Sequence, residues 1–129
     1  MSGLNRCGYC QGIHTATAER LGVHDGLVPR LVGNFETAAI SHEMRPVLCY
    51  ARKLTEDPAS IAQADADAIL AAGWDELAIF HTVAVTALFN LMNRLVEGLG
   101  IEFNPAYAAD ASQRLAERGY LPLLGMLKR

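Results

Sequence analysis

The longest run without a charged side chain extends from Leu77 to Asn93, and its apolar residues recur at helical spacing. Acidic residues precede the run and two glycines follow it, so the pattern predicts one long helix over 75–97. Polar side chains interrupt the run, whereas a helix that spans a bilayer would be longer and drier. We therefore expect the core helix of a soluble protein, buried on most sides. Its apolar stripe consists of Leu77, Phe80, Ala84, Leu88, Leu91 and Leu95, widened by Val83, Val85, Ala87 and Phe89.

The remaining sequence also indicates helices joined by short loops, without the alternation of apolar and polar residues that is typical of strands. Its 129 residues, 51% of them hydrophobic, suit one ordinary domain with a core. We predict an all-α chain with a single domain over 1–129. The other helices are expected over 4–21, 26–35, 64–72 and 106–118, with an apolar tail at 120–127 and a further helix that begins near Ser41, or restarts at Pro46, and stops at Asp57 and Pro58.

The charge balance excludes some partners. Eleven basic and fourteen acidic residues give a net charge of -3, and no basic cluster is visible. This pattern argues against nucleic acid or a membrane surface as the partner. The polar residues 1–11 lack the apolar core of a signal peptide, and three cysteines make a poor disulfide framework. We predict a cytoplasmic protein.

Two cysteines and a histidine form the motif that carries chemistry. Cys7, Cys10 and His14 lie three and four residues apart, so on a helix they share one face. Unpaired N–H groups at a helix start stabilise a thiolate, which is the nucleophile in disulfide exchange and in peroxide reduction. His14 can take the proton of Cys10. The spacing therefore favours Cys10 as the activated sulfur and Cys7 as the resolving one.

Other interpretations of the same residues stay open. The cysteine pair could bind zinc, with a fourth ligand from His24, His42, His81 or Cys49, or the two cysteines could be buried and inert. Cys49 is expected to be a small core residue, and His81 to be a core histidine or to line the thiol pocket. Trp74 is expected to pack at a helix junction. Asn90 and Asn93 are expected to form hydrogen bonds across helices or at a subunit contact.

The run LNRCGYCQGIH at 4–14 resembles the redox helix of AhpD-like alkylhydroperoxidases, in the carboxymuconolactone decarboxylase superfamily. Residues 53–58, 72–74, 87–90 and 93–100 are similar to the peroxidase-related branch, so the likeness covers nearly the whole chain. It implies an all-helical bundle that assembles as a homo-oligomer, such as a dimer, trimer or hexamer. It also implies a thiol peroxidase without a metal or organic cofactor.

Under this resemblance Cys10 matches the cysteine that attacks the peroxide, Cys7 the resolving cysteine and His14 the histidine of the proton relay. The expected activity is that of an antioxidant oxidoreductase, which reduces an alkyl hydroperoxide through a redox-active disulfide. A thiol or dithiol reductant would then restore the two cysteines. Members of the decarboxylase branch lack the cysteine pair, so the pair points to the redox branch.

The chain departs from the family pattern at two places. The family has a glutamate upstream of the cysteine pair, whereas no acidic residue precedes Cys7, and Glu19 lies downstream of His14. Tyr9 replaces a histidine between the cysteines of the best-known members. We therefore expect a bundle without the family's leading helical segment. Such a bundle would expose part of the long helix, which a second subunit would cover. A zinc-binding module or a catalytically degenerate helical oligomerisation module is the alternative.

Overall fold

The computed structural model describes residues 1–24 and 26–121, which form α-helices and short 3₁₀ turns and contain no strand. The prediction of an all-α fold is confirmed, and the arrangement is consistent with an AhpD-like bundle. The predicted tail at 120–127 lies outside the described residues beyond Leu121. The elements are α1 (Gly8–Arg20), α2 (Leu27–Gly33), η1 (Phe35–Thr37), α3 (Met44–Glu56), η2 (Pro58–Ser60), α4 (Gln63–Ala71), α5 (Glu76–Gly98) and α6 (Pro105–Arg118).

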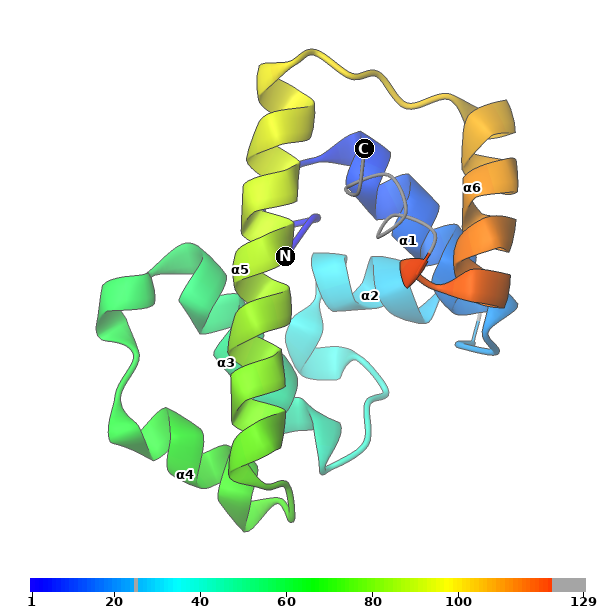
Figure 1. Ribbon diagram of the computed structural model, residues 1–129. Coiled ribbons are helices and arrows are strands. Elements are labelled where there is room, and N and C mark those ends of the chain that lie inside the picture. Colours follow the sequence, from blue (N-terminus) through cyan, green and yellow to red (C-terminus); the bar gives the residue numbers. More distant parts are fainter. Residues whose placement is uncertain (25, 122–129) are drawn as a thin grey trace.

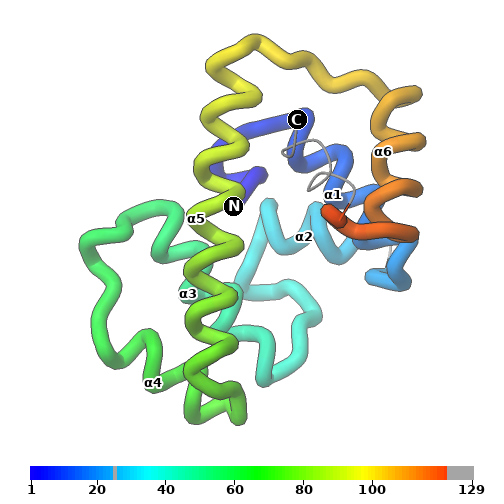
Figure 2. The backbone as a smooth tube through the Cα atoms, viewed as in Figure 1, coloured from blue at the N-terminus to red at the C-terminus, as the bar shows by residue number. Residues whose placement is uncertain are grey.

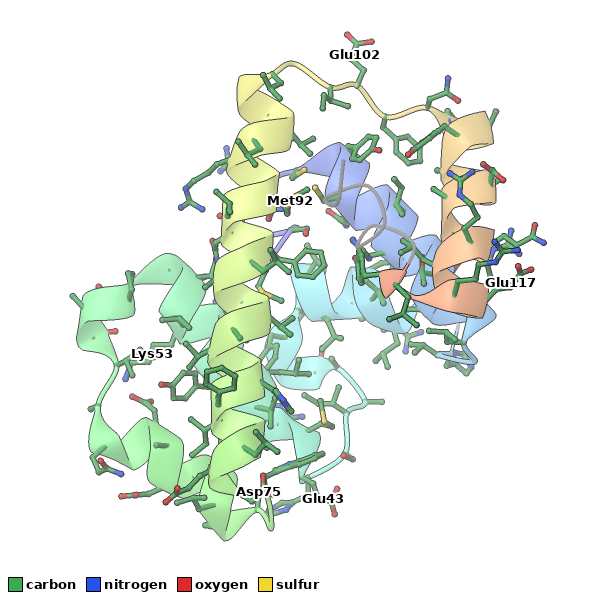
Figure 3. All side chains as sticks on the ribbon, viewed as in Figure 1. Glu43, Lys53, Asp75, Met92, Glu102 and Glu117 are labelled. Carbon is green, nitrogen blue, oxygen red and sulfur yellow. The ribbon has the colours of Figure 1, made fainter. Side chains whose placement is uncertain are left out.

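Helix α5 runs through the middle of the molecule, with α3 and α4 packed on one side and α1 on the other, and α6 packs against α1 (Figure 1). Arg20 of α1 donates a hydrogen bond to the buried Ser112 of α6 over 3.0 Å, which fixes these two helices together. On the opposite side Lys53 reaches from α3 to Asp65 at the start of α4, 2.6 Å away (Figure 3). The tube in Figure 2 shows that the chain returns from the top of α5 through a long loop to α6, beside α1.

The first helix begins later than the sequence indicated. Residues 2–6 form turns instead of a helix, and Cys7 N–H donates to Ser2 O over 2.9 Å. Arg6 adopts a left-handed φ of 56°, which interrupts any right-handed helix before Cys7. The α-helix therefore starts at Gly8, with Cys7 as its N-cap, and ends before Gly22, whose φ is 90°.

The prediction that the long helix is buried on most sides is wrong. The expected apolar stripe of α5 faces outward, with Phe80 64% and Leu88 52% exposed. The buried side chains on this helix are Thr82, Thr86, Asn93 and Val96. The helical period was therefore right, but the face that contacts the rest of this chain is the polar one.

The inward polar face of α5 is satisfied by hydrogen bonds. Asn5 Nδ2 donates to the side-chain oxygens of both Asn90 and Asn93, each over 2.9 Å. Asn93, which is 1% exposed, donates in turn to Ser2 Oγ, and Asn90 donates to Thr55 Oγ1 of α3. The expectation that these asparagines bond across elements is confirmed. They hold the turns of residues 2–6 against α5.

Helix α5 is also the one described helix that is long and apolar enough to cross a membrane by length and composition. Only 17% of its most apolar 18-residue window is buried within the chain. The hydrogen-bonded amides of Asn90 and Asn93 lie on its inner face.

Candidate redox site

Cys7 and Cys10 lie at the start of α1, where the helix geometry brings them together. Cys7 is the N-cap residue, and its sulfur accepts the N–H of Cys10 over 3.4 Å. Both side chains pack with Val96 of α5 in one cluster, against which the ring of Tyr9 lies. The structure therefore brings the predicted pair into one buried position, with both thiols free.

Burial determines the ionisation of Cys7. Its side chain is 0% exposed, and its pKa is raised from 9.0 to about 12. Burial is the largest cause, hydrogen bonds with the side chains of Cys10 and Glu97 act in the same direction, and together they outweigh the N–H of Cys10, which lowers the pKa. Cys7 is therefore a neutral thiol near pH 7, and it must lose its proton before its sulfur can act as a nucleophile.

Cys10 and His14 line the same cavity, whereas Cys7, which packs with Cys10 and Val96, is not among its lining residues. The cavity has a volume of about 400 Å³ and lies between α1, α5 and α6. Its lining is apolar apart from the thiol of Cys10, the imidazole of His14, three tyrosines and the guanidinium of Arg114. Among the residues that the structure describes, no carboxylate lines it. The lining side chains that matter for the chemistry are Cys10, His14, Phe89, Tyr107, Arg114 and Tyr120.

His14 is held by two aromatic neighbours. The ring of Phe89 stands edge-on to the imidazole with centroids 4.8 Å apart, and Tyr120 Oη lies 3.2 Å from His14 Nε2. Burial lowers the pKa of His14 below its usual 6.5. The imidazole is therefore neutral near pH 7 and able to take a proton from a thiol.

Gly119 and Tyr120, which directly follow α6, also line the cavity. Gly119 has a φ of 58° and ends the helix, and the chain turns there so that Tyr120 reaches His14. Burial raises the pKa of Tyr120, and the charge of Cys10 adds to this effect. Sequence analysis missed this residue because it fell within an apolar tail. A glycine that ends a helix and is followed by tyrosine was the available signal.

The other candidates lie away from the cavity. Cys49 is exposed, so the expectation of a core cysteine is wrong, because the face of α3 that carries it points to solvent. His81 is exposed on the outward face of α5 and lines neither described cavity. His24 and His42 are exposed too. Trp74 joins the start of α5 to α3, since its indole N–H donates to Glu43 O over 2.8 Å.

The zinc interpretation finds no ligand set in the described part of the chain. Within residues 1–24 and 26–121, no group of three His, Cys, Asp or Glu side chains could hold a metal ion. The residues proposed as a fourth ligand are the exposed ones above, on other elements.

The chain is similar to a solved structure of a protein from Silicibacter sp. TM1040. That protein is an uncharacterized peroxidase-related protein. The TM-score is 0.77 and the sequence identity 30%, over 83% of this chain and 56% of the other. This chain thus spans little more than half of the length of the chain that it matches. The likeness agrees with the peroxidase-related branch to which residues 53–58, 72–74, 87–90 and 93–100 were similar.

No model of a protein family matches the sequence, and no curated protein matches it.

Proposed function

We propose that this chain is a thiol peroxidase, which reduces hydroperoxides through Cys10 and Cys7. The observation that carries the proposal is the shared cavity, because the one thiol that lines it lies beside a neutral histidine. The similarity to a peroxidase-related protein supports a redox role of the oxidoreductase type. Peroxide reduction needs a thiolate, a proton for the leaving alkoxide and a second thiol, and the three residues supply them.

The reaction follows from these three side chains. His14 takes the proton of the Cys10 thiol, and the thiolate attacks the terminal oxygen of the hydroperoxide. The O–O bond breaks, Cys10 becomes a sulfenic acid, and His14 returns the proton to the alkoxide to give an alcohol. Cys7 then attacks the sulfenic sulfur as its proton passes to the departing hydroxide, which forms the Cys7–Cys10 disulfide and releases water. An external dithiol reduces this disulfide and is itself oxidised.

The cavity favours an apolar hydroperoxide. Its walls are mainly aliphatic and aromatic, and a volume of about 400 Å³ admits a substituted aromatic or branched alkyl group. We expect a higher kcat/KM for cumene hydroperoxide than for hydrogen peroxide, since only the former displaces water from these walls. Equal kcat/KM values for the two hydroperoxides would contradict the inference that the cavity binds the organic group of the substrate.

Peroxide consumption with dithiothreitol as the reductant tests the proposal. The Cys10→Ser variant should lose turnover, and the exposed Cys49→Ser variant is its matched control and should keep it. The Cys7→Ser variant should accumulate a Cys10 sulfenic acid that a dimedone adduct reveals by mass spectrometry. Consumption that persists in Cys10→Ser would overturn the assignment. A disulfide that forms without catalytic turnover would instead favour a degenerate scaffold.

We also propose that the chain forms a homo-oligomer through the exposed apolar face of α5. The side chains on this face are about half exposed or more, and an apolar face of this length is costly in water. Leu88 and Met92 belong both to this face and to the cavity rim. A second copy seated there would also roof the cavity.

Light scattering at micromolar concentration tests this assembly. Leu91→Glu adds a negative charge within the exposed face and should shift the protein toward monomer. Gln113→Glu on the exposed side of α6 adds the same charge elsewhere and should leave the mass unchanged. A wild-type protein that is monomeric throughout would contradict the proposal. The dithiol needed for each cycle fits the cytoplasmic location that we predict.

A further inference from the structure

The hydrogen bond between Tyr120 and His14 gives the site a residue that the motif at 7–14 does not contain. Tyr120 lies 106 positions further along the chain than His14, and its hydroxyl is 3.2 Å from Nε2. The two rings are also in contact, with centroids 6.2 Å apart, and Phe89 packs beside both. The imidazole is therefore held on one edge by a phenol and on its face by a second aromatic ring.

We propose that Tyr120 is the positioning residue of this site: its oxygen accepts the Nε2–H of His14 and so keeps Nδ1 unprotonated, ready to take the Cys10 proton. The inference rests on the proposed function. A neutral imidazole carries one proton, so fixing that proton on Nε2 determines which nitrogen acts as base. The same hydrogen bond stabilises the imidazolium that forms when Cys10 is deprotonated, because an acceptor favours the charged donor.

The surroundings of His14 leave this role to Tyr120. Arg114, a cation, is paired with Asp110 and covers the ring of Tyr107. Phe89, Leu88, Met92 and Val96, which α5 contributes to the cavity, carry no titratable group. His14 borders two cavities. In the cavity between α1, α5 and α6, the other titratable and charged groups are Tyr9, Cys10, Tyr107, Arg114 and Tyr120. In a second cavity, between the N-terminal turns, α1, α2 and α3, they are Arg52 and the amino group of Met1.

The phenol suits this role because it stays neutral. Burial raises its pKa, and the negative charge of a Cys10 thiolate would raise it further, so Tyr120 does not ionise while Cys10 does. Tyr120 is 48% exposed, so its own proton can be donated to solvent while its oxygen accepts from His14. A carboxylate in the same place would also act as an acceptor but would repel the thiolate.

The experiment compares Tyr120→Phe with Tyr107→Phe. Both remove a hydroxyl at the rim of the same cavity and keep the ring, but only Tyr120 bonds to His14. The first measurement uses the reduced protein without peroxide: nitrogen NMR of His14 should show an Nε2–H tautomer in the wild type and in Tyr107→Phe. In Tyr120→Phe the two tautomers should mix. The midpoint of His14 titration should move to lower pH, because an acceptor of the charged form is lost.

The second measurement is the single-turnover rate of Cys10 oxidation by cumene hydroperoxide as a function of pH. Tyr120→Phe should lower it by about tenfold or more near neutral pH, within the range of general-base effects. The Cys49→Ser variant, changed at an exposed residue away from the cavity, should not. If Cys10 reacts in the wild type but Tyr120→Phe changes neither tautomer nor pH profile, the inference is overturned. If Cys10 does not react in the wild type, the proposed function fails, while the tautomer shift still decides the role of Tyr120.

Discussion

Replacing Gly12 by alanine should destabilise the helix that carries the cysteines, although helix propensity alone would favour alanine. Alanine is favoured over glycine in a helix interior by about 1 kcal/mol. A Cβ at Gly12 would, however, lie 2.8 Å from Cζ of Phe103, in the loop between α5 and α6, and closer still to the adjacent ring atom. Overpacking of this kind typically costs about 1–3 kcal/mol. We expect a net loss of about 1 kcal/mol in the free energy of unfolding, because the half-exposed ring can move part of the way.

A double-mutant cycle in urea, followed by circular dichroism, isolates this contact. In a Phe103→Ala background the same Gly12→Ala change should stabilise the protein by about 0.5–1 kcal/mol, since only the helix propensity remains. Gly8→Ala is the matched control, because a Cβ there meets no atom within 4 Å, and it should be neutral or slightly stabilising. Equal shifts for Gly12→Ala in both backgrounds would refute the reasoning.

Three further outcomes follow from other features. The pKa of Cys7 is raised from 9.0 to about 12, so the thiol ionises at lower pH in the unfolded chain than in the folded one. The free energy of unfolding should therefore fall as the pH rises from 9 to 12. Urea unfolding curves across this pH range should show a shallower fall for Cys7→Ala than for the wild type. Asn93→Ala removes a buried partner of Asn5 and should cost about 1–3 kcal/mol, with faster amide exchange at residues 2–7. Gly119→Ala forces a left-handed φ of 58° on alanine in open space, so it should displace Tyr120 and mimic Tyr120→Phe in the NMR measurement.

The sequence predicted the elements better than their faces. Capping and glycine signals located the helices to within a few residues, apart from the first helix, where the left-handed Arg6 delays the start to Gly8. The helical period of the apolar residues in α5 was read correctly, but periodicity does not show which face of the helix contacts the rest of the chain, and here the apolar face is exposed. Within this chain the amides of Asn90 and Asn93 face inward, because the turns of residues 2–6 offer them hydrogen-bond partners.

The candidate site was likewise predictable from the sequence only in part. The spacing of Cys7, Cys10 and His14 is local, so the sequence predicted their shared face. Phe89 and Tyr120 reach that face from other elements, and no local pattern brings such residues together. The sequence also gave no indication of which thiol is more buried, because burial depends on α5 packing over the start of α1.

The hydrogen bonds of Asn5 to Asn90 and Asn93 join residues 85 and 88 positions apart, and Arg20 meets Ser112 across 92. Closing a loop of that length costs about 4 kcal/mol of chain entropy by the logarithmic relation. The wall of the cavity therefore forms only when residues 5–20 have met α5 and α6, and contacts of such long sequence separation form slowly. A short peptide with the same cysteine and histidine spacing would keep the three side chains but lack the cavity, the buried thiol and the phenol beside the imidazole. Cutting the loop between α5 and α6 should likewise abolish the site while sparing the helices on the far side of α5.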